Sequence, residues 1–82
     1  MVRFINLDSA INEIEKIHNN VDPSDDFEKD LFDTTIEALQ VLHAAHHHKM
    51  ISDEELRKEG LKFANVYFEA YENQGFIYKM EV

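Results

Sequence analysis

The chain has no cysteine, and glycine and proline are scarce, with two and one residues respectively. Without cysteine there is no disulfide framework, no thiolate ligand for a metal and no thiol nucleophile. Cysteine-free chains are common in reducing compartments, so we expect a cytoplasmic protein. The two glycines, Gly60 and Gly75, stand too far apart in the sequence to form a glycine-rich phosphate-binding loop.

Basic residues are also few: 8 lysines and arginines stand against 17 aspartates and glutamates, for a net charge of −9. A nucleic-acid-binding protein needs a basic footprint, so we expect no direct binding to DNA or RNA, and no binding to an anionic membrane surface. No apolar run is long enough to cross a bilayer, and the N-terminus has no signal-peptide pattern. The charge favours another protein with a basic surface as the partner.

The acidic residues are concentrated between positions 22 and 33, where Lys29 is the one basic residue. Such a cluster indicates either a solvated helix start or a face that binds a basic protein, and an EF-hand pattern of calcium ligands is missing. We take the second interpretation as the functional hypothesis. The predicted partner-binding acids are Asp22, Asp25, Asp26, Glu28, Asp30 and Asp33.

Residues 24–48 have the periodicity of one long amphipathic helix, which we expect to form the backbone of the core. Its start offers two N-caps, either Asp22 with Pro23 at the first helical position or Ser24. Apolar and small residues recur at intervals of three and four. The expected inward stripe is Phe27, Leu31, Thr35, Ala38, Leu42 and Ala45, widened by Phe32, Ile36, Leu39 and His46.

Two further helices are predicted. The first is capped by Asn6 or Asp8, has apolar residues at helical spacing from Leu7 to Val21, and is ended by Asn19-Asn20. The third begins after Ser52, where Ser-Asp-Glu-Glu is a capping box, and runs to about residue 73 before Gly75 stops it. Gly60 inside this helix indicates that a neighbouring helix or aromatic ring approaches closely.

The two ends of the chain, residues 1–5 and 76–82, have β-prone patterns. A lone strand is not stable, so the two segments are expected to pair if they form strands at all. The predicted fold is therefore a single domain over residues 1–82: a mostly α, compact three-helix bundle, with a short two-stranded sheet from the N- and C-terminal segments as an optional addition. The alternative is a pure bundle with an extended tail.

Four histidines stand at the end of the central helix, between positions 43 and 48. His43 and His47 are one helical turn apart, which is the spacing of a two-point metal site. The competing interpretation is a polar helix end, where imidazolium interacts well with the helix dipole. A metal-binding or metal-responsive protein built on His43 and His47 is therefore the alternative function, while no motif indicates a cofactor.

The last third of the chain is rich in aromatic residues, among them Tyr67 and Tyr71. Most of them are expected in the core, but a hydrophobic content of 44% in 82 residues leaves a surplus for an interface. We assign Tyr67 and Tyr71 to partner binding and expect either a homodimer or a hetero-partner.

Catalysis is not indicated, because the serines lie at helix starts and no cleft-forming motif is present. The predicted function is thus that of a small acidic, non-enzymatic protein-interaction module. In its sharpest form, the protein inhibits or sequesters a nucleic-acid-acting partner with a basic surface.

Overall fold

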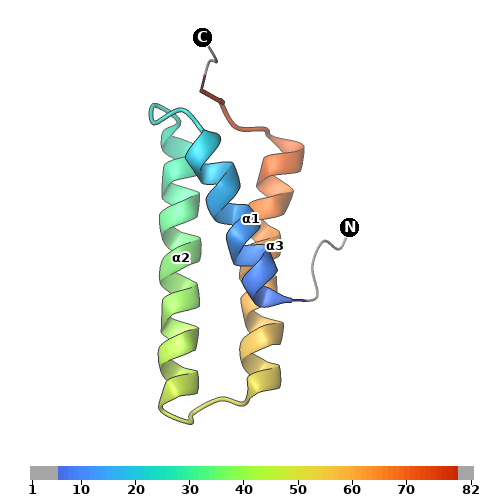
Figure 1. Cartoon of the computed structure of the whole chain (residues 1–82). Helices are drawn as coiled ribbons and strands as arrows, with labels where there is room; N and C mark the ends of the chain where they lie inside the picture. Colours follow the sequence, from blue (N-terminus) through green and yellow to red (C-terminus); the bar gives the residue numbers. More distant parts are fainter. Residues whose placement is uncertain (1–5, 80–82) are drawn as a thin grey trace.

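The computed structural model describes residues 6–79 and shows three helices in the order α1, α2 and α3. α1 spans Leu7–Asn20, α2 spans Asp26–His47 and α3 spans Asp53–Asn73. The chain runs up α1, down α2 and up α3, and α1 lies obliquely across the α2–α3 pair (Figure 1). The prediction of a mostly α, three-helix bundle is confirmed.

The helix starts are fixed by side-chain caps. Asn6 accepts a hydrogen bond from the Ser9 N–H at 3.2 Å, and Ser52 accepts one from the Glu55 N–H at 3.1 Å. The Ser52 cap was predicted from the sequence, and Asn6 was one of the two caps predicted for the first helix. The cap of α2 was not, because Asp25 holds that position rather than Asp22 or Ser24. The Asp22 carboxylate instead accepts the Ser24 N–H at 2.9 Å, which folds the preceding residues into a turn and delays the helix.

The structure explains why glycine stands at each of its two positions. A Cβ on Gly60 would lie 2.7 Å from a methyl carbon of Leu7, so this glycine lets the start of α1 approach α3 closely, as predicted. Gly75 follows α3 with a φ of 71°, a left-handed conformation that glycine adopts without strain.

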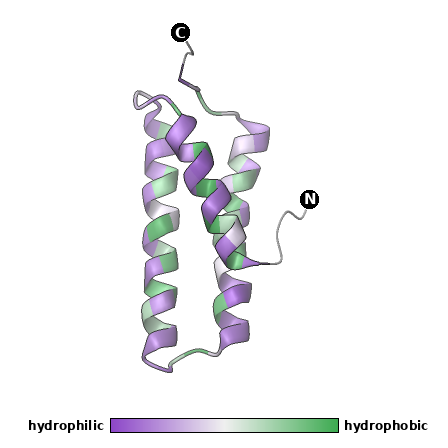
Figure 2. Ribbon diagram, viewed as in Figure 1, coloured by the Kyte–Doolittle hydropathy of each residue, from purple (hydrophilic) through white to green (hydrophobic). Residues whose placement is uncertain are grey.

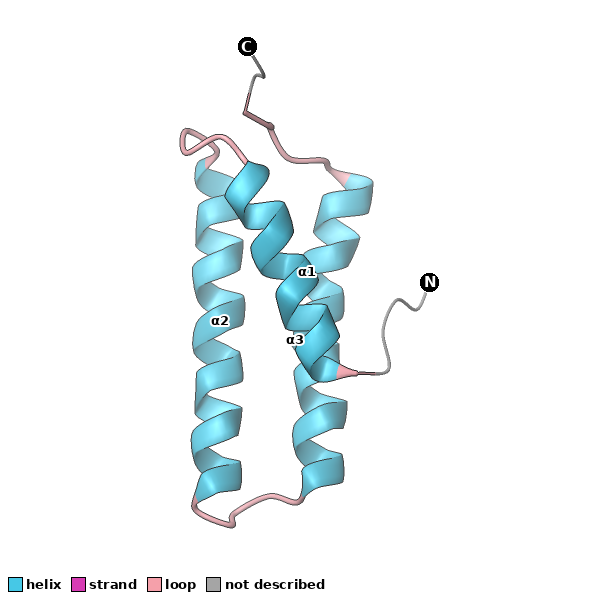
Figure 3. Cartoon of the chain, in the orientation of Figure 1, coloured by secondary structure: helices cyan, strands magenta, loops and turns pink. Residues whose placement is uncertain are grey.

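The described part of the chain, residues 6–79, contains no strand, only one isolated antiparallel bridge between Val21 and Tyr78 (Figure 3). We call the described segment after Gly75, residues 76–79, the tail. It is held at the α1–α2 loop by hydrogen bonds from the Asp22 N–H to the Ile77 carbonyl and from the Lys79 N–H to the Asn20 carbonyl, at 2.7 and 2.9 Å. The optional sheet is thus not supported: the tail pairs with the α1–α2 loop, and residues 1–5 lie outside the described residues.

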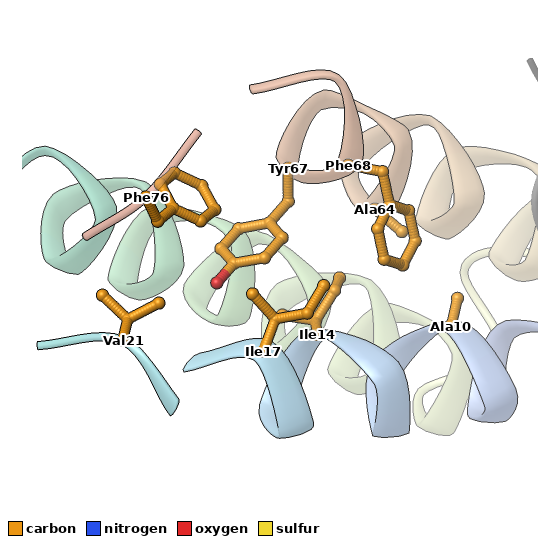
Figure 4. Packing of buried hydrophobic residues seen from close by; sticks show 8 residues of the cluster. All are labelled: Ala10, Ile14, Ile17, Val21, Ala64, Tyr67, Phe68 and Phe76. Atoms are coloured by element: carbon orange, nitrogen blue, oxygen red, sulfur yellow. The ribbon is translucent and has the colours of Figure 1, made fainter. Parts of the chain in front are cut away.

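The main apolar cluster lies between α1 and α3 and is closed at one end by the tail (Figure 4). Coloured by hydropathy, the helices show apolar residues where they face one another and polar residues outside (Figure 2). The cluster consists of Ala10, Ile14, Ile17, Val21, Ala64, Tyr67, Phe68 and Phe76.

The prediction that the central helix forms the backbone of the core is supported in part: the main apolar cluster comes from α1, α3 and the tail, and Leu31 and Phe32 of α2 pack against it. The buried residues of α2 are Glu28, Thr35 and Leu39, of which two are polar. Phe27, which the sequence placed on the inward stripe, is 46% exposed. Thr35 and Leu39 belong to the predicted inward face, which is confirmed at its centre, whereas Phe27 at its edge points outward and the buried Glu28 was not expected there.

Candidate functional site

The six acidic residues predicted to bind a partner divide into two groups in the structure. Asp26, Asp30 and Asp33 are exposed on α2, and Asp22 is partly exposed in the loop before it. Asp25 and Glu28 are buried. The local turn explains the division, because Asp25 caps the helix and Glu28 follows on its inward side.

The exposed carboxylates of α2 form a line that we call the acidic ridge, consisting of Asp26, Asp30, Asp33 and Glu37. Their spacing of four, three and four residues keeps them within an arc of about 60° on one side of the helix. All four are exposed, and among residues 6–79 none of them takes part in an ion pair. Glu37 was not among the predicted residues, although its helical spacing from Asp33 is the signal that assigns it to the same side.

Asp25 has a structural role at the start of α2. One carboxylate oxygen accepts the Glu28 N–H at 3.0 Å, and the other accepts the Ile77 N–H from the tail at 2.9 Å. Both bonds are directed into the molecule. Asp25 therefore joins the helix start to the tail, and its side chain is 9% exposed.

Glu28 lies at the centre of a polar cluster to which each helix contributes one residue: His18 from α1, Glu28 from α2 and Tyr67 from α3. The Glu28 carboxylate oxygens lie 2.9 and 3.0 Å from Nδ1 of His18, and the Tyr67 hydroxyl donates a hydrogen bond to Glu28 Oε2 at 2.5 Å. Glu28 is 1% exposed and Tyr67 is fully buried. Burial of a carboxylate is tolerated here because hydrogen-bond partners satisfy it.

The assignment of Glu28 and Tyr67 to a partner-contacting surface is therefore wrong, since both side chains lie inside the molecule. Burial of the Tyr67 phenol, together with its hydrogen bond to Glu28, raises the pKa of this hydroxyl. The phenol thus remains protonated and donates its hydrogen bond throughout the neutral pH range.

His18 covers one side of this cluster and stacks on Phe32, with ring centroids 3.7 Å apart and the rings nearly parallel. Its side chain is 33% exposed. It lines a surface cavity of about 290 Å³ beside the α1–α2 loop, and Asp22, Lys29, Asp33 and Lys79 are also on the wall. At Asp22, the hydrogen bond from the Ser24 N–H holds the pKa of the carboxyl below its usual value.

Tyr71 remains accessible, as the partner-binding prediction requires, with 38% of the side chain exposed. It belongs to an aromatic group at the tail, with ring centroids 6.0 Å from Phe76 and 6.2 Å from Tyr78. Burial and a hydrogen bond with Tyr71 raise the pKa of Tyr78. Phe27 also packs against Phe76, at a centroid distance of 6.3 Å, so this group reaches the start of α2.

The histidines lie at the opposite end of α2. His43 and His47 are exposed, and His46 contacts the Asp53 carboxylate at the start of α3. The structure brings together no group of three or more potential metal ligands among residues 6–79. Two-point metal binding by His43 and His47 stays a prediction.

No family model matches this chain, and comparison with curated proteins and with solved structures finds no significant similarity. Among the three helices of residues 6–79, none has the length and apolar character needed to cross a membrane. The function is therefore argued from the residues of the chain itself.

Proposed function

We propose that this chain is a non-enzymatic protein-binding module that recognises a basic surface of another protein through the acidic ridge of α2. The observation that supports this proposal is the line of four exposed carboxylates, Asp26, Asp30, Asp33 and Glu37, with no ion pair to any described residue. Like charges at these spacings destabilise a helix by about 0.2–0.5 kcal/mol per pair. Lysine or arginine residues of a partner would relieve this repulsion on binding.

A further argument comes from the whole molecule. The net charge of −9 produces a negative potential that attracts a basic partner and raises the rate of encounter. The sharpest form of the proposal is that the partner is a nucleic-acid-acting protein, whose basic binding surface the ridge occupies. The protein would then inhibit or sequester that partner, and nucleic acid would compete with it.

The first experiment is a pull-down from a lysate of the source cells with a tag other than polyhistidine, so that capture does not depend on the native histidine run. The ridge variant carries Asp30→Asn, Asp33→Asn and Glu37→Gln. The control variant removes three charges on α1, with Asp8→Asn, Glu13→Gln and Glu15→Gln. Bound proteins are quantified by mass spectrometry at about 50 mM and about 500 mM salt, since the higher concentration screens exposed charges.

We expect a partner that the wild-type chain and the control variant hold at low salt, and that high salt or the ridge substitutions release. For the nucleic-acid-acting form, added DNA or RNA should release the same partner. Equal loss of the partner from the ridge and control variants would show that net charge alone is responsible. A partner held by all three proteins in both salts would rule out the ridge as the binding surface.

A further inference from the structure

A second surface feature lies next to the acidic ridge: an apolar groove between α2 and α3, which we call the back groove. Its volume is about 420 Å³. Glu37, a residue of the ridge, is part of its wall, so the two features are continuous. The lining residues are Thr34, Glu37, Ala38, Val41, Leu42 and Phe63.

The back groove lies on the side of the α2–α3 pair that α1 does not cover. α1 contacts α2 through the stacking of His18 on Phe32. At 100° per residue, Thr34, Ala38 and Val41 point between about 120° and 180° away from Phe32. Figure 1 shows α1 crossing one side of the pair.

The same relation holds on α3. Phe68 belongs to the cluster formed with α1 (Figure 4). Phe63 and Val66 point about 140° and 160° away from Phe68. Both helices therefore turn an apolar side to the same uncovered face.

Large apolar side chains are exposed along this face. Val41 is 64% exposed, Val66 is 53% exposed and Phe63 is 41% exposed, and Phe27 continues the line towards the start of α2. From Phe27 to Val41 the face is about 21 Å long, the length of a helix of about 14 residues. Small residues at Thr34 and Ala38 allow close approach of a partner backbone.

The charges beside the groove decide which partner fits. On the α2 side stands the acidic ridge. The exposed or half-buried charged residues of α3 near this side are Glu55, Lys58, Glu59, Lys62 and Glu69, with Lys62 paired to Glu59 at 3.0 Å. The surroundings of the groove are thus acidic overall, chiefly because of the ridge. A second copy of this chain would place acidic residues against acidic residues, whereas an amphipathic helix with lysine or arginine beside its apolar stripe would place opposite charges together.

We infer that the back groove binds a cationic amphipathic helix of a partner protein, with the apolar stripe of that helix in the groove and its basic residues against the acidic ridge. This inference rests on the proposed function and specifies the structure of the partner segment. Electrostatic attraction supplies fast association, and the apolar side chains supply the contacts that hold the complex.

The test uses the full chain and three synthetic peptides of about 15 residues, followed by fluorescence anisotropy. The first peptide has leucine at helical spacing and lysine on the flanks. The second has the same composition in an order that abolishes the apolar stripe, and the third keeps the stripe but has glutamate in place of lysine. Two uncharged substitutions, Val41→Gln and Phe63→Gln, remove the apolar contacts in the groove.

A matched control replaces two exposed apolar residues elsewhere, with Met50→Gln and Ile77→Gln; these side chains are 75% and 59% exposed. The expected result is that the first peptide binds best, and that the groove variant weakens it by about tenfold while the control variant leaves it unchanged. Amide chemical-shift changes on adding this peptide should be centred on residues 34–42 and on Phe63. The peptide carrying glutamate should not bind.

Equal affinity for the first two peptides, or no effect of the groove substitutions, would overturn the inference. In that case, loss of peptide binding in the ridge variant would still support the proposed function, so the two failures are distinguishable. Sedimentation gives the other decisive result: a wild-type dimer that Val41→Gln and Phe63→Gln convert to a monomer would show that a second copy occupies the groove, against the inference.

Discussion

α1 and α2 are both amphipathic helices, but they bury different kinds of side chain. The buried residues of α1 are all apolar, namely Leu7, Ala10, Ile14 and Ile17. Those of α2 are Glu28, Thr35 and Leu39. An apolar stripe is stabilised by any well-packed apolar neighbour, whereas a buried carboxylate is stabilised only by partners at hydrogen-bond distance. The orientation of α2 therefore depends on His18 and Tyr67 to a degree that has no parallel in α1.

The largest expected loss of stability comes from a substitution in the apolar stripe of α1. Ile14 is fully buried in the cluster with α3. Ile14→Ala should lower the free energy of unfolding by about 3–4 kcal/mol, because it removes apolar contacts and leaves a cavity. Urea denaturation followed by circular dichroism measures the change. Val41→Ala, at an exposed position, is the control and should cost less than about 0.5 kcal/mol.

Glu28→Gln is the matching test of α2. The substitution keeps the size of the side chain but removes the charge that accepts hydrogen bonds from His18 and Tyr67, so we expect a loss of about 2 kcal/mol. A double-mutant cycle with Tyr67→Phe should give effects that do not add, since the two side chains share one hydrogen bond. Additive effects would show that Glu28 and Tyr67 do not interact in solution.

The raised pKa of Tyr67 makes the stability of the polar cluster around Glu28 depend on pH, unlike that of the apolar stripe of α1. In the unfolded chain a tyrosine titrates near pH 10, and in the folded protein burial and Glu28 raise that pKa. The contribution of Tyr67 to stability is therefore complete below about pH 10 and is lost as the pH rises through the folded pKa.

Urea denaturation between pH 8 and pH 11 measures this effect. The free energy of unfolding should fall more steeply above pH 10 in the wild type than in Tyr67→Phe. Lysines titrate in the same range, but they are common to both proteins, so the difference between the two curves isolates the phenol. Parallel curves would contradict the prediction.

The smallest expected change in the free energy of unfolding is on the outer side of α2, where a substitution should stabilise the protein rather than destabilise it. Asp30→Asn removes a like-charge pair with Asp26 and another with Asp33, so it should stabilise the free protein by a few tenths of a kcal/mol at low salt. In about 1 M salt, where the Debye length is about 3 Å, the gain should vanish. Glu15→Gln on α1, which has no acidic neighbour three or four positions away, is the control, and an equal gain there would indicate net charge rather than the ridge.

Much of the fold could be predicted because its signals are local. The Ser52 cap, the stop at Gly75 and the close approach at Gly60 each depend on a few neighbouring residues, and the structure confirms all three. The burial of Glu28 could not be predicted in the same way. Phe27 and Glu28 are neighbours at the start of α2, and hydropathy favours burial of the phenylalanine, which is the exposed one of the two.

Glu28 is held inside by the polar cluster, whose members are distant in the sequence. Tyr67 is 39 positions from Glu28 and His18 is 10 positions away. Nothing local to any of these residues indicates that they meet. For the same reason, the candidate surface was identified only in part: the exposed acids Asp26, Asp30 and Asp33 were predicted, while the buried Asp25 and Glu28 were wrongly included and Glu37 was missed.

The attachment of the tail to the α1–α2 loop has a consequence for local opening of the fold. The helical hairpins close over short loops, whereas the contacts of Ile77 and Lys79 with Asp25 and Asn20 join segments more than fifty positions apart. The α1–α3 contacts of the core have a similar separation, but the tail is held by a few bonds near the surface, and such a segment opens first when a protein fluctuates. In hydrogen-exchange terms, the amides of Ile77 and Lys79 should exchange together, before those of α3. Because Phe76 closes one end of the core, that same opening would briefly expose the aromatic interior.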